Sequence, residues 1–310
     1  MKILVTGAAG FIGSHIADAL VREGHKVLGI DNLSTGSLSN VNEKIEFHEC
    51  DISTPEAARI IEKLRPEVIC HQAAQVNLRH SVDDPVGDAR SNVLGTVNIA
   101  SVAARAGTRH IVFSSTGGAI YGDGVPIPTP VGSNTRPVSP YGAAKLSAEI
   151  YLSMFAGLKN LDVTCLRYAN VYGPRQNPHG EAGVVAIFLT RWLQDQTPQI
   201  NGNGLQTRDY VYVGDIVAAN LSAIRARQTG TYNVGTGIET SVIELHDAML
   251  KALGTGAHAS HGPAKLGEQL RSCLDFSETT QDLGWTPTTS LEEGLQQTAD
   301  WFRTLVRANG

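Results

Sequence analysis

Tyr141 and Lys145 stand four residues apart in the segment Ser139-Pro140-Tyr141-Gly142-Ala143-Ala144-Lys145, and this spacing places both side chains on one face of a helix. An ammonium group beside a phenol can lower the pKa of the phenol from its ordinary value of about 10. Such a phenolate can take the proton from an alcohol while a nicotinamide takes the hydride. The pair alone is a weak motif, because helix surfaces carry many such pairs by chance. It predicts redox chemistry on a hydroxyl group when the chain also carries a dinucleotide site.

A glycine fingerprint close to the N-terminus predicts that dinucleotide site. The segment Thr6-Gly7-Ala8-Ala9-Gly10-Phe11-Ile12-Gly13 follows a predicted strand and opens a predicted helix. Its glycines allow a tight turn and let a pyrophosphate approach the backbone at the N-terminus of the helix. Glycines at a strand–helix turn can also be purely structural, but their placement here favours a cofactor site made by Gly7, Gly10, Phe11, Ile12 and Gly13. The spacing is Gly-x-x-Gly-x-x-Gly, not the Gly-x-Gly-x-x-Gly of the commoner dehydrogenases.

An acidic residue ends the second predicted strand, in Gly29-Ile30-Asp31-Asn32. A carboxylate at this place accepts hydrogen bonds from the adenosine ribose and repels a 2′-phosphate. No arginine stands beside Asp31, so the sequence predicts NAD rather than NADP. The alternative is an aspartate that only caps its own turn. Asp51-Ile52, after the third predicted strand, is placed to reach the adenine, or else Asp51 is simply an acid at a helix N-terminus.

The first 170 residues alternate between apolar strands and helices. Short apolar strands separated by helices predict a parallel sheet covered on both faces, which is a Rossmann-type, doubly wound α/β fold. The predicted strands are Lys2–Thr6, Lys26–Ile30, Ile45–Glu49, Val68–His71, His110–Ser114 and Asp162–Arg167. The predicted helices are Phe11–Arg22, Pro55–Leu64, Val86–Ala106 and Tyr141–Leu158.

The pattern after Pro174 is irregular and predicts a smaller mixed α/β cap that binds the substrate. A strand at Thr231–Val234 is expected to return to the main sheet, and Leu291–Val306 reads as an amphipathic helix. We therefore expect an NAD-binding domain at residues 1–174 with about 214–237. The substrate-binding domain is expected at about 175–213 and 238–310.

Composition places the chain among ordinary globular proteins. Hydrophobic residues make up 42% of the 310 residues and charged residues 18%, with a net charge of −5. This net negative charge does not indicate a nucleic-acid-binding protein, and no apolar run approaches the roughly 20 residues of a membrane span. No signal peptide is evident, since Lys2 leads directly into a strand. The four scattered cysteines predict reduced, buried thiols in a cytoplasmic protein, and we expect no metal.

Ordered motifs along nearly the whole chain resemble the extended short-chain dehydrogenase/reductases, in the NAD-dependent epimerase/dehydratase family. The chain is most similar to the UDP-glucose 4-epimerase branch. Besides the glycines, Asp51 and Tyr141/Lys145, the matching segments are Asp31-Asn32-Leu33-Ser34-Thr35-Gly36, His71-Gln72-Ala73-Ala74-Gln75, Asn92-Val93-Leu94-Gly95-Thr96, Ser114-Ser115-Thr116-Gly117-Gly118-Ala119-Ile120-Tyr121-Gly122, Arg167-Tyr168-Ala169-Asn170-Val171-Tyr172-Gly173-Pro174-Arg175 and Arg208-Asp209-Tyr210.

The resemblance implies roles for individual residues. Tyr141 would be the base and acid, and Lys145 would bind the nicotinamide ribose and keep Tyr141 ionised. A hydroxyl at the end of the fifth strand would bond the sugar's carbon-4 oxygen, and we expect Thr116 to do so, with Ser115 as the alternative. Because this chain has one residue more than the family's usual loop before Tyr121, that assignment is open. The further cofactor contacts implied are Asn32, Gln72, Ala73, Ala74, Gln75, Asn92, Ser114 and Tyr168.

The loop Gly117-Gly118-Ala119 favours one reaction over others. Related 4,6-dehydratases carry Thr-Asp-Glu there and related decarboxylases keep a glutamate, whereas this loop offers no acid or base for carbons 5 and 6. The resemblance thus implies a 4-epimerase that oxidises and re-reduces one carbon with bound NAD. The alternatives are a nucleotide-sugar dehydrogenase or reductase of the same family and a non-catalytic NAD-binding sensor.

The resemblance also implies a site for a UDP-sugar. Arg208 would bind the diphosphate, because a guanidinium is permanently charged and bidentate. Lys265-Leu266-Gly267-Glu268 replaces the family's Arg-x-Gly-Asp, and a lysine lacks the guanidinium fork. We expect Arg271 to compensate for it; the alternative is that Lys265 and Glu268 are only solvated charges. Relatives commonly dimerise through two helices, here Val86–Ala106 and Tyr141–Leu158. The remaining implied substrate contacts are Asn170, Val184, Val185, Phe188, Tyr210 and Ser272.

Overall fold

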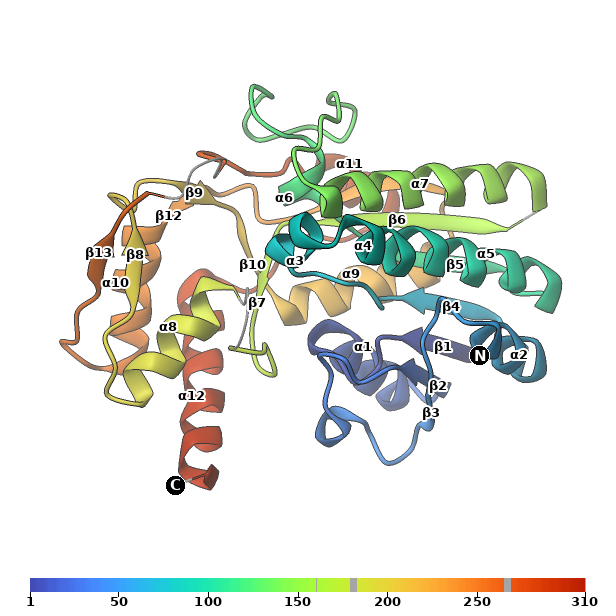
Figure 1. Ribbon diagram of the computed structural model, residues 1–310, viewed down its shortest axis with the longest axis horizontal. Helices are drawn as coiled ribbons and strands as arrows, with labels where there is room; N and C mark the ends of the chain where they lie inside the picture. The colour runs from blue at the N-terminus through green and yellow to red at the C-terminus, as the bar shows by residue number, and fades with distance from the viewer. Residues whose placement is uncertain (160, 179–182, 265–268, 310) are drawn as a thin grey trace.

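A parallel, seven-stranded sheet forms the centre of the larger part of the computed structural model (Figure 1), which describes residues 1–159, 161–178, 183–264 and 269–309. The strand order is β11-β6-β5-β4-β1-β2-β3. All six adjacent pairs are parallel, so the predicted α/β fold class is confirmed. The strands are β1 (Lys2–Thr6), β2 (Lys26–Asp31), β3 (Glu46–Glu49), β4 (Val68–His71), β5 (His110–Thr116), β6 (Asp162–Tyr168) and β11 (Gly230–Val234).

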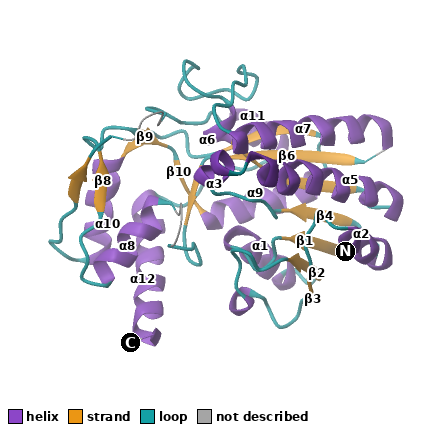
Figure 2. Ribbon diagram, in the orientation of Figure 1, coloured by secondary structure: helices purple, strands orange, loops and turns teal. Residues whose placement is uncertain are grey.

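Helices cover both faces of this sheet (Figure 2). Alternate residues of β1 supply the two cores: Ile3 and Val5 belong to one buried cluster, and Leu4 to the other. The first cluster includes α1 (Phe11–Arg22) and α9 (Val213–Ala226), next to α11 (Ser277–Leu283), while the second includes α2 (Pro55–Leu64), α5 (Gly95–Ala106) and α7 (Pro140–Lys159). β1 has β2 on one side and β4 on the other, so the chain reverses direction across the sheet at β1, where doubly wound folds bind their ligands.

The predicted helix Val86–Ala106 is divided in the structure. It comprises α4 (Pro85–Ala89), the single π-turn η2 (Arg90–Leu94) and α5, and it is preceded by the unpredicted short helix α3 (Leu78–Asp83). π-Turns are rare and occur often at functional sites. Here the π-turn carries Asn92, whose amide is buried.

A one-turn helix, α6 (Gly117–Ile120), accommodates the extra residue of the loop after β5. Two glycines let this turn pack closely. A Cβ on Gly117 would come within 2.4 Å of Leu274, and one on Gly142 within 2.3 Å of the Ala119 oxygen. These two close approaches pack the turn against Leu274 and against α7.

A second layer of elements forms the cap, at the left in Figure 1. Its core joins Phe188, Trp192, Leu245 and Phe302. Three two-stranded sheets, β10–β7, β12–β9 and β13–β8, lie in this region. The elements of the cap are β7 (Asn170–Tyr172), α8 (Val184–Leu193), β8 (Gln199–Asn201), β9 (Thr207–Arg208), β10 (Tyr210–Tyr212), β12 (Thr240–Ser241), α10 (Val242–Leu253), β13 (Ser260–Gly262) and α12 (Leu291–Asn309). Outside the cap, the loop after β2 contains the 3-10 turn η1 (Leu38–Asn40).

Candidate active site

The glycine turn between β1 and α1 fits a pyrophosphate. Gly7 has a φ of 71°, and a Cβ on Gly13 would come within 2.0 Å of the Gly7 oxygen, so bare backbone is required at both places. Gly10 is the N-cap of α1 and offers no side-chain hydrogen bond to the first N–H groups of the helix. These N–H groups and the helix dipole make this end of α1 suitable for the phosphates of NAD. Phe11 and Ile12 form the first turn beside them.

Asp31 joins this turn to the end of β2. Its carboxylate accepts hydrogen bonds from the backbone N–H groups of Ala9 (3.0 Å) and Leu33 (2.8 Å). The side chain thus caps its own turn, as the alternative interpretation proposed, and also holds the glycine turn. Each carboxylate oxygen can accept more than one hydrogen bond, so the contact with Ala9 leaves room for a ribose hydroxyl.

Asn32 and Asp51 lie side by side after β2 and β3, with 3.1 Å between the Asn32 amide nitrogen and an Asp51 oxygen. Burial favours the neutral acid, but hydrogen bonds from the backbone and hydroxyl of Ser53 and from Asn32 outweigh it and lower the pKa of Asp51. Asp51 is therefore a charged acceptor that also caps its turn. Ile52 is buried against Gly95.

The segment after β4 is held by a reciprocal amide pair. The Gln75 N–H donates to the Asn92 side-chain oxygen at 2.9 Å, and the Asn92 amide donates back to the Gln75 backbone oxygen at 2.9 Å. One carboxylate oxygen of buried Asp88 accepts from both side chains, at 2.8 and 3.0 Å, and the other has no hydrogen-bond partner among the described residues. The predicted cofactor contacts Ala73 and Ala74 lie in this same segment, partly buried.

Tyr168 is the last residue of β6. Its ring is buried, and its hydroxyl accepts a hydrogen bond of 2.8 Å from Asn220 and lies 3.4 Å from the Gln72 side-chain oxygen. Asn220 also accepts from the Gln72 amide at 3.2 Å. Tyr168 and Asn220 thus fix the side chain of Gln72, and Asn220 was not identified from the sequence.

Tyr141 and Lys145 lie in α7 at the predicted spacing, but their electrostatics differ from the prediction. Lys145 is buried, and its ammonium donates to the backbone oxygen of Ser114 at 2.9 Å. Burial lowers the pKa of Lys145 to about 8, although the Asp88 and Glu149 carboxylates favour its charged form. Burial raises the pKa of Tyr141, and the charge of Asp88 raises it further. For the chain by itself, the pKa of Tyr141 is therefore raised rather than lowered as predicted, because its hydroxyl loses hydration and experiences the charge of Asp88.

The end of β5 separates the two candidate hydroxyls. Side chains alternate between the faces of a strand, so Ser114 and Thr116 share one face and Ser115 points to the other. The Ser115 hydroxyl is buried and donates to Glu149 at 2.5 Å, while Thr116 is only partly buried. This arrangement favours Thr116 over Ser115 as the group that meets a substrate. The Ser114 hydroxyl donates to the His71 backbone oxygen at 3.1 Å.

Asp209 connects three segments of the chain next to β9 and β10. Its buried carboxylate accepts hydrogen bonds from the Thr236 N–H (2.8 Å) and hydroxyl (2.6 Å) and from the N–H groups of Gly237 and Leu274, both at 3.2 Å. One side chain therefore joins the start of β10, the turn after β11 and the segment that carries Ser272. The predicted substrate contacts Arg208 and Tyr210 flank it on either side, in β9 and β10.

The other predicted substrate residues differ in their accessibility. Asn170 is exposed in β7, close to Gly118. Within α8, Val184 is partly buried, whereas Val185 and Phe188 are sealed in the cap core. Ser272 is 6% exposed, and its N–H donates to the Thr207 oxygen at 3.2 Å.

Arg271 is not a free cation in place of Lys265. Its guanidinium pairs with Glu239, with a nitrogen–oxygen distance of 2.9 Å for Nε and a second contact through the terminal nitrogen. Lys265 and Glu268 lie outside the described residues. No cluster of metal-binding side chains occurs in the described part of the chain, and none of its helices is long and apolar enough to cross a membrane.

The chain matches the model of the NAD dependent epimerase/dehydratase family over residues 3–235. It is 45% identical to a UDP-glucose 4-epimerase of Mycolicibacterium smegmatis, with 98% of this chain and 99% of that protein covered. The crystal structure of a UDP-glucose 4-epimerase from Thermotoga maritima with UDP-glucose has a TM-score of 0.95 at 45% identity, covering 99% of this chain and 100% of that one. That of a UDP-glucose 4-epimerase from Thermus thermophilus in complex with NAD has a TM-score of 0.92 at 41% identity, covering 98% and 99%.

Proposed function

The chain belongs to the NAD-dependent epimerase/dehydratase family, and we propose that it is a UDP-hexose 4-epimerase that interconverts UDP-glucose and UDP-galactose. The observation that carries the proposal is the arrangement at the end of β5. Thr116 ends β5 and is only partly buried, Tyr141 and Lys145 lie in α7, and the turn after Thr116, Gly117-Gly118-Ala119, contains no acid or base. Such a site can move one proton and one hydride at a single carbon.

The residues of the chain divide the work at carbon 4. Tyr141 takes the proton from the carbon-4 hydroxyl, whose oxygen accepts a hydrogen bond from Thr116, and later returns that proton. NAD held by the glycine turn and Asp31 would supply the acceptor for the hydride of carbon 4 and the donor that re-reduces the 4-keto sugar on its opposite face. Lys145 supplies a positive charge that favours ionised Tyr141 in the assembled site. Atoms and electrons balance over the cycle, so no net redox change occurs.

The cap supplies the recognition of the substrate. Arg208, placed next to buried Asp209, binds the diphosphate, since a guanidinium forms bidentate hydrogen bonds with phosphate oxygens. Asn170 reaches the sugar beside Gly118, where the absent side chain leaves room. Rotation of the keto-sugar between the two hydride transfers requires that the nucleotide be held while the sugar remains free to turn.

An exposed apolar face supports the expected homodimer. The outer side of α7 presents Ile150 (63% exposed), Met154 (39%) and Leu158 (70%), next to Val86 (69%) of α4 and Leu94 (59%) of η2. Contiguous apolar surface of this kind is typical of an interface. We infer that a second copy of the chain covers it, and Met154→Glu should convert a dimer to a monomer in light-scattering measurements. The described cysteines, all buried and unpaired, support a cytoplasmic location.

A direct assay tests the proposed reaction. Purified protein is incubated with UDP-galactose, the products are separated, and absorbance at the NADH band is followed at the same time. We expect UDP-glucose to form without net NADH, and denatured protein to release NAD. Formation of NADH in step with product would instead identify a dehydrogenase, and binding of NAD without any turnover would identify a sensor.

A further inference from the structure

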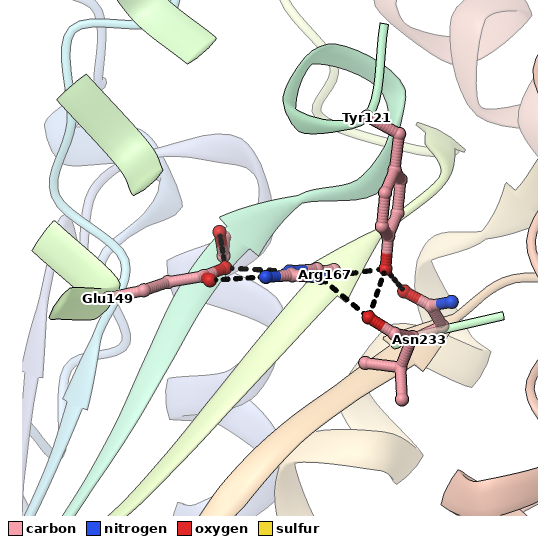
Figure 3. A network of polar contacts seen from close by, with 6 residues as sticks. Tyr121, Glu149, Arg167 and Asn233 are labelled. Atoms are coloured by element: carbon pink, nitrogen blue, oxygen red, sulfur yellow. Dashed lines mark hydrogen bonds and ion pairs between the residues drawn. The ribbon is translucent and has the colours of Figure 1, made fainter. Parts of the chain in front are cut away.

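A buried arginine, Arg167 in β6, lies between Glu149 of α7 and Tyr121 after α6 (Figure 3). Its side chain is 8% exposed. Two guanidinium nitrogens donate to the Glu149 carboxylate at 3.0 and 2.7 Å, and the third donates to the Tyr121 hydroxyl at 2.8 Å and to the Val131 backbone oxygen at 3.1 Å. All three nitrogens of the planar guanidinium are thus used, each in a fixed direction.

Glu149 connects this arginine to the catalytic helix. It lies four residues after Lys145 and eight after Tyr141 in α7, so the three side chains follow one face of the helix. Glu149 is buried, and one of its oxygens also accepts the Ser115 hydroxyl at 2.5 Å. Glu149 therefore binds α7 to both β5 and β6.

The residues that bracket Thr116 complete the network. Ser115 precedes Thr116 directly, and Tyr121 closes the one-turn helix that follows it. The Tyr121 hydroxyl accepts from Arg167 and donates to the Asn233 side chain at 2.7 Å. Both sides of Thr116 are consequently tied, through Glu149 and Arg167, to the helix that carries Tyr141.

Stability alone is a weak reason for a buried pair of this kind. Removing two charges from water is costly, and apolar residues of similar volume often serve as well or better. A guanidinium that holds three neighbours in set directions does have a geometric consequence, because a displacement of about 1 Å at a reacting centre can cost about 100-fold in rate.

We propose that Arg167 is a positioning residue for the epimerase reaction: through Glu149, Ser115 and Tyr121 it sets the separation of the Thr116 hydroxyl from the Tyr141 hydroxyl. The inference rests on the proposed function. In its proposed role Arg167 requires no contact with substrate or cofactor. It acts by fixing the end of β5 against α7, so that one sugar oxygen can meet both hydroxyls at once.

The test compares Arg167→Lys with a matched destabilised control, Ile61→Ala, in the distant helix α2. Lysine keeps the charge, but one ammonium cannot reach Glu149 and Tyr121 in the fixed directions of the guanidinium. The measurements are kcat per bound NAD, KM for UDP-galactose, the melting temperature, and the Thr116–Tyr141 hydroxyl separation in crystals. For Arg167→Lys we expect kcat to fall roughly 30- to 100-fold, KM to stay within about twofold, and the separation to change. The control should lose melting temperature but not kcat.

A second variant keeps the ion pair intact, in case Arg167→Lys does not fold. Ser115→Ala combined with Tyr121→Phe removes only the two hydroxyls that connect the pair to either side of Thr116, and kcat should fall about tenfold with KM unchanged. An unchanged hydroxyl separation, or a loss of kcat no larger than that of Ile61→Ala, would overturn the proposal. If wild-type protein does not interconvert the UDP-hexoses, the proposed function fails, while the crystallographic separation still tests the positioning.

Discussion

Lys145 donates its ammonium hydrogen bond to the backbone oxygen of Ser114, at 2.9 Å. The bond joins the middle of the α7 face to the end of β5, and the ammonium also lies 4.8 Å from the centre of the Phe113 ring. The Lys145 ammonium is thus hydrogen-bonded to β5. Burial keeps the pKa of Tyr141 above its ordinary value. In the proposed reaction, we therefore expect ionisation of Tyr141 to depend on the positive nicotinamide ring of bound NAD as well as on Lys145.

Replacing Tyr141 by phenylalanine should abolish most of the turnover. We expect kcat to fall by roughly two to four orders of magnitude, the ordinary contribution of a general base, while NAD remains bound. The matched control is Tyr151→Phe, at an exposed position of the same helix. Product formation and NAD content per chain provide the readouts, and near-normal activity of Tyr141→Phe would remove this residue from the mechanism.

Asp88 should set the pH range in which the site works. Its carboxylate faces Tyr141 and Lys145 of α7 and His80 of α3, and it raises the pKa of Tyr141 and opposes the lowering of the Lys145 pKa by burial. Removing this charge in Asp88→Asn lowers both pKa values. Ionised Tyr141 then forms at lower pH, and the Lys145 ammonium is also lost at lower pH. Both limbs of the kcat profile should therefore move to lower pH.

The control for this shift is Asp83→Asn, at an exposed position of α3. An asparagine at 88 can still accept the hydrogen bonds from Gln75 and Asn92, so lost contacts with them do not explain a moved profile. A profile of Asp88→Asn that coincides with the wild type would show that the charge of Asp88 does not reach the catalytic pair.

Asp31 should determine the choice of NAD over NADP. Asp31→Ala should weaken NAD binding and reduce the preference, because the ribose loses an acceptor and a 2′-phosphate is no longer repelled. Asp31→Asn is the informative partner, since its oxygen can still accept from Ala9 or Leu33 but carries no charge. Affinities for both cofactors, measured by calorimetry on protein stripped of NAD, test this. Equal losses of affinity for NAD and NADP would show that Asp31 only caps its own turn.

The sequence was most informative where one spacing serves one geometry. The turn at Gly7 needs a positive φ, and Tyr141 and Lys145 need one helical face. The positions of the glycine turn and of the Tyr141/Lys145 pair could therefore be predicted from the sequence. The strand limits of β1 and β4 were also correct, because buried parallel strands read as short apolar runs. Long-range contacts left no such pattern. Nothing in the sequence indicates that Asp88 accepts from Gln75 and Asn92, or that Arg271 pairs with Glu239.

The sequence contains patterns that indicate two further features of the site. Glu149 continues the i, i+4 series of Tyr141 and Lys145, which marks it as a member of the same face. Alternation along β5 already separates Ser115 from Thr116. The direction of the Tyr141 pKa could not have been predicted, since it depends on how deeply the ring is buried and on the charge of Asp88.

Acid should destabilise the fold through His71. This ring is fully buried between the hydroxyls of Thr6 (2.7 Å) and Thr96 (3.0 Å), and burial lowers its pKa to about 3. The unfolded chain binds a proton near pH 6.5, so the stabilisation is complete above that pH and is lost as the pH falls toward 3. Between pH 7.5 and 5.0 the free energy of unfolding should drop by about 2 kcal/mol from this group.

Urea unfolding at the two pH values measures this loss. His110, whose pKa burial lowers to about 4, adds a similar contribution to the wild-type total. His71→Gln should therefore be less stable at pH 7.5 but show a smaller drop on acidification. An identical drop in wild type and variant would mean that His71 is not the titrating group.

Ser272 should determine whether N-acetylated sugars are accepted. The resemblance to the family implies that this position would border the carbon-2 substituent of the sugar, where a bulky tyrosine accompanies unmodified hexoses. The structure places Ser272 in the segment held by Asp209 and Thr207, so its backbone position is fixed from both sides. A serine in place of a phenol ring leaves room for an acetamido group, because packed interiors otherwise contain few voids of that size. We expect wild type to turn over both UDP-galactose and its N-acetyl form.

Ser272→Tyr should abolish turnover of the N-acetyl sugar while sparing UDP-galactose, and Ser272→Ala should keep both activities. The comparison is the ratio of kcat/KM for the two sugars in each variant, which cancels any loss of folded protein. Because the side chain is only 6% exposed, the new ring must project into the sugar pocket or displace the segment, and displacement would slow both sugars alike. An equal loss for both, or a wild type inactive on the N-acetyl sugar, would exclude Ser272 as the selective position.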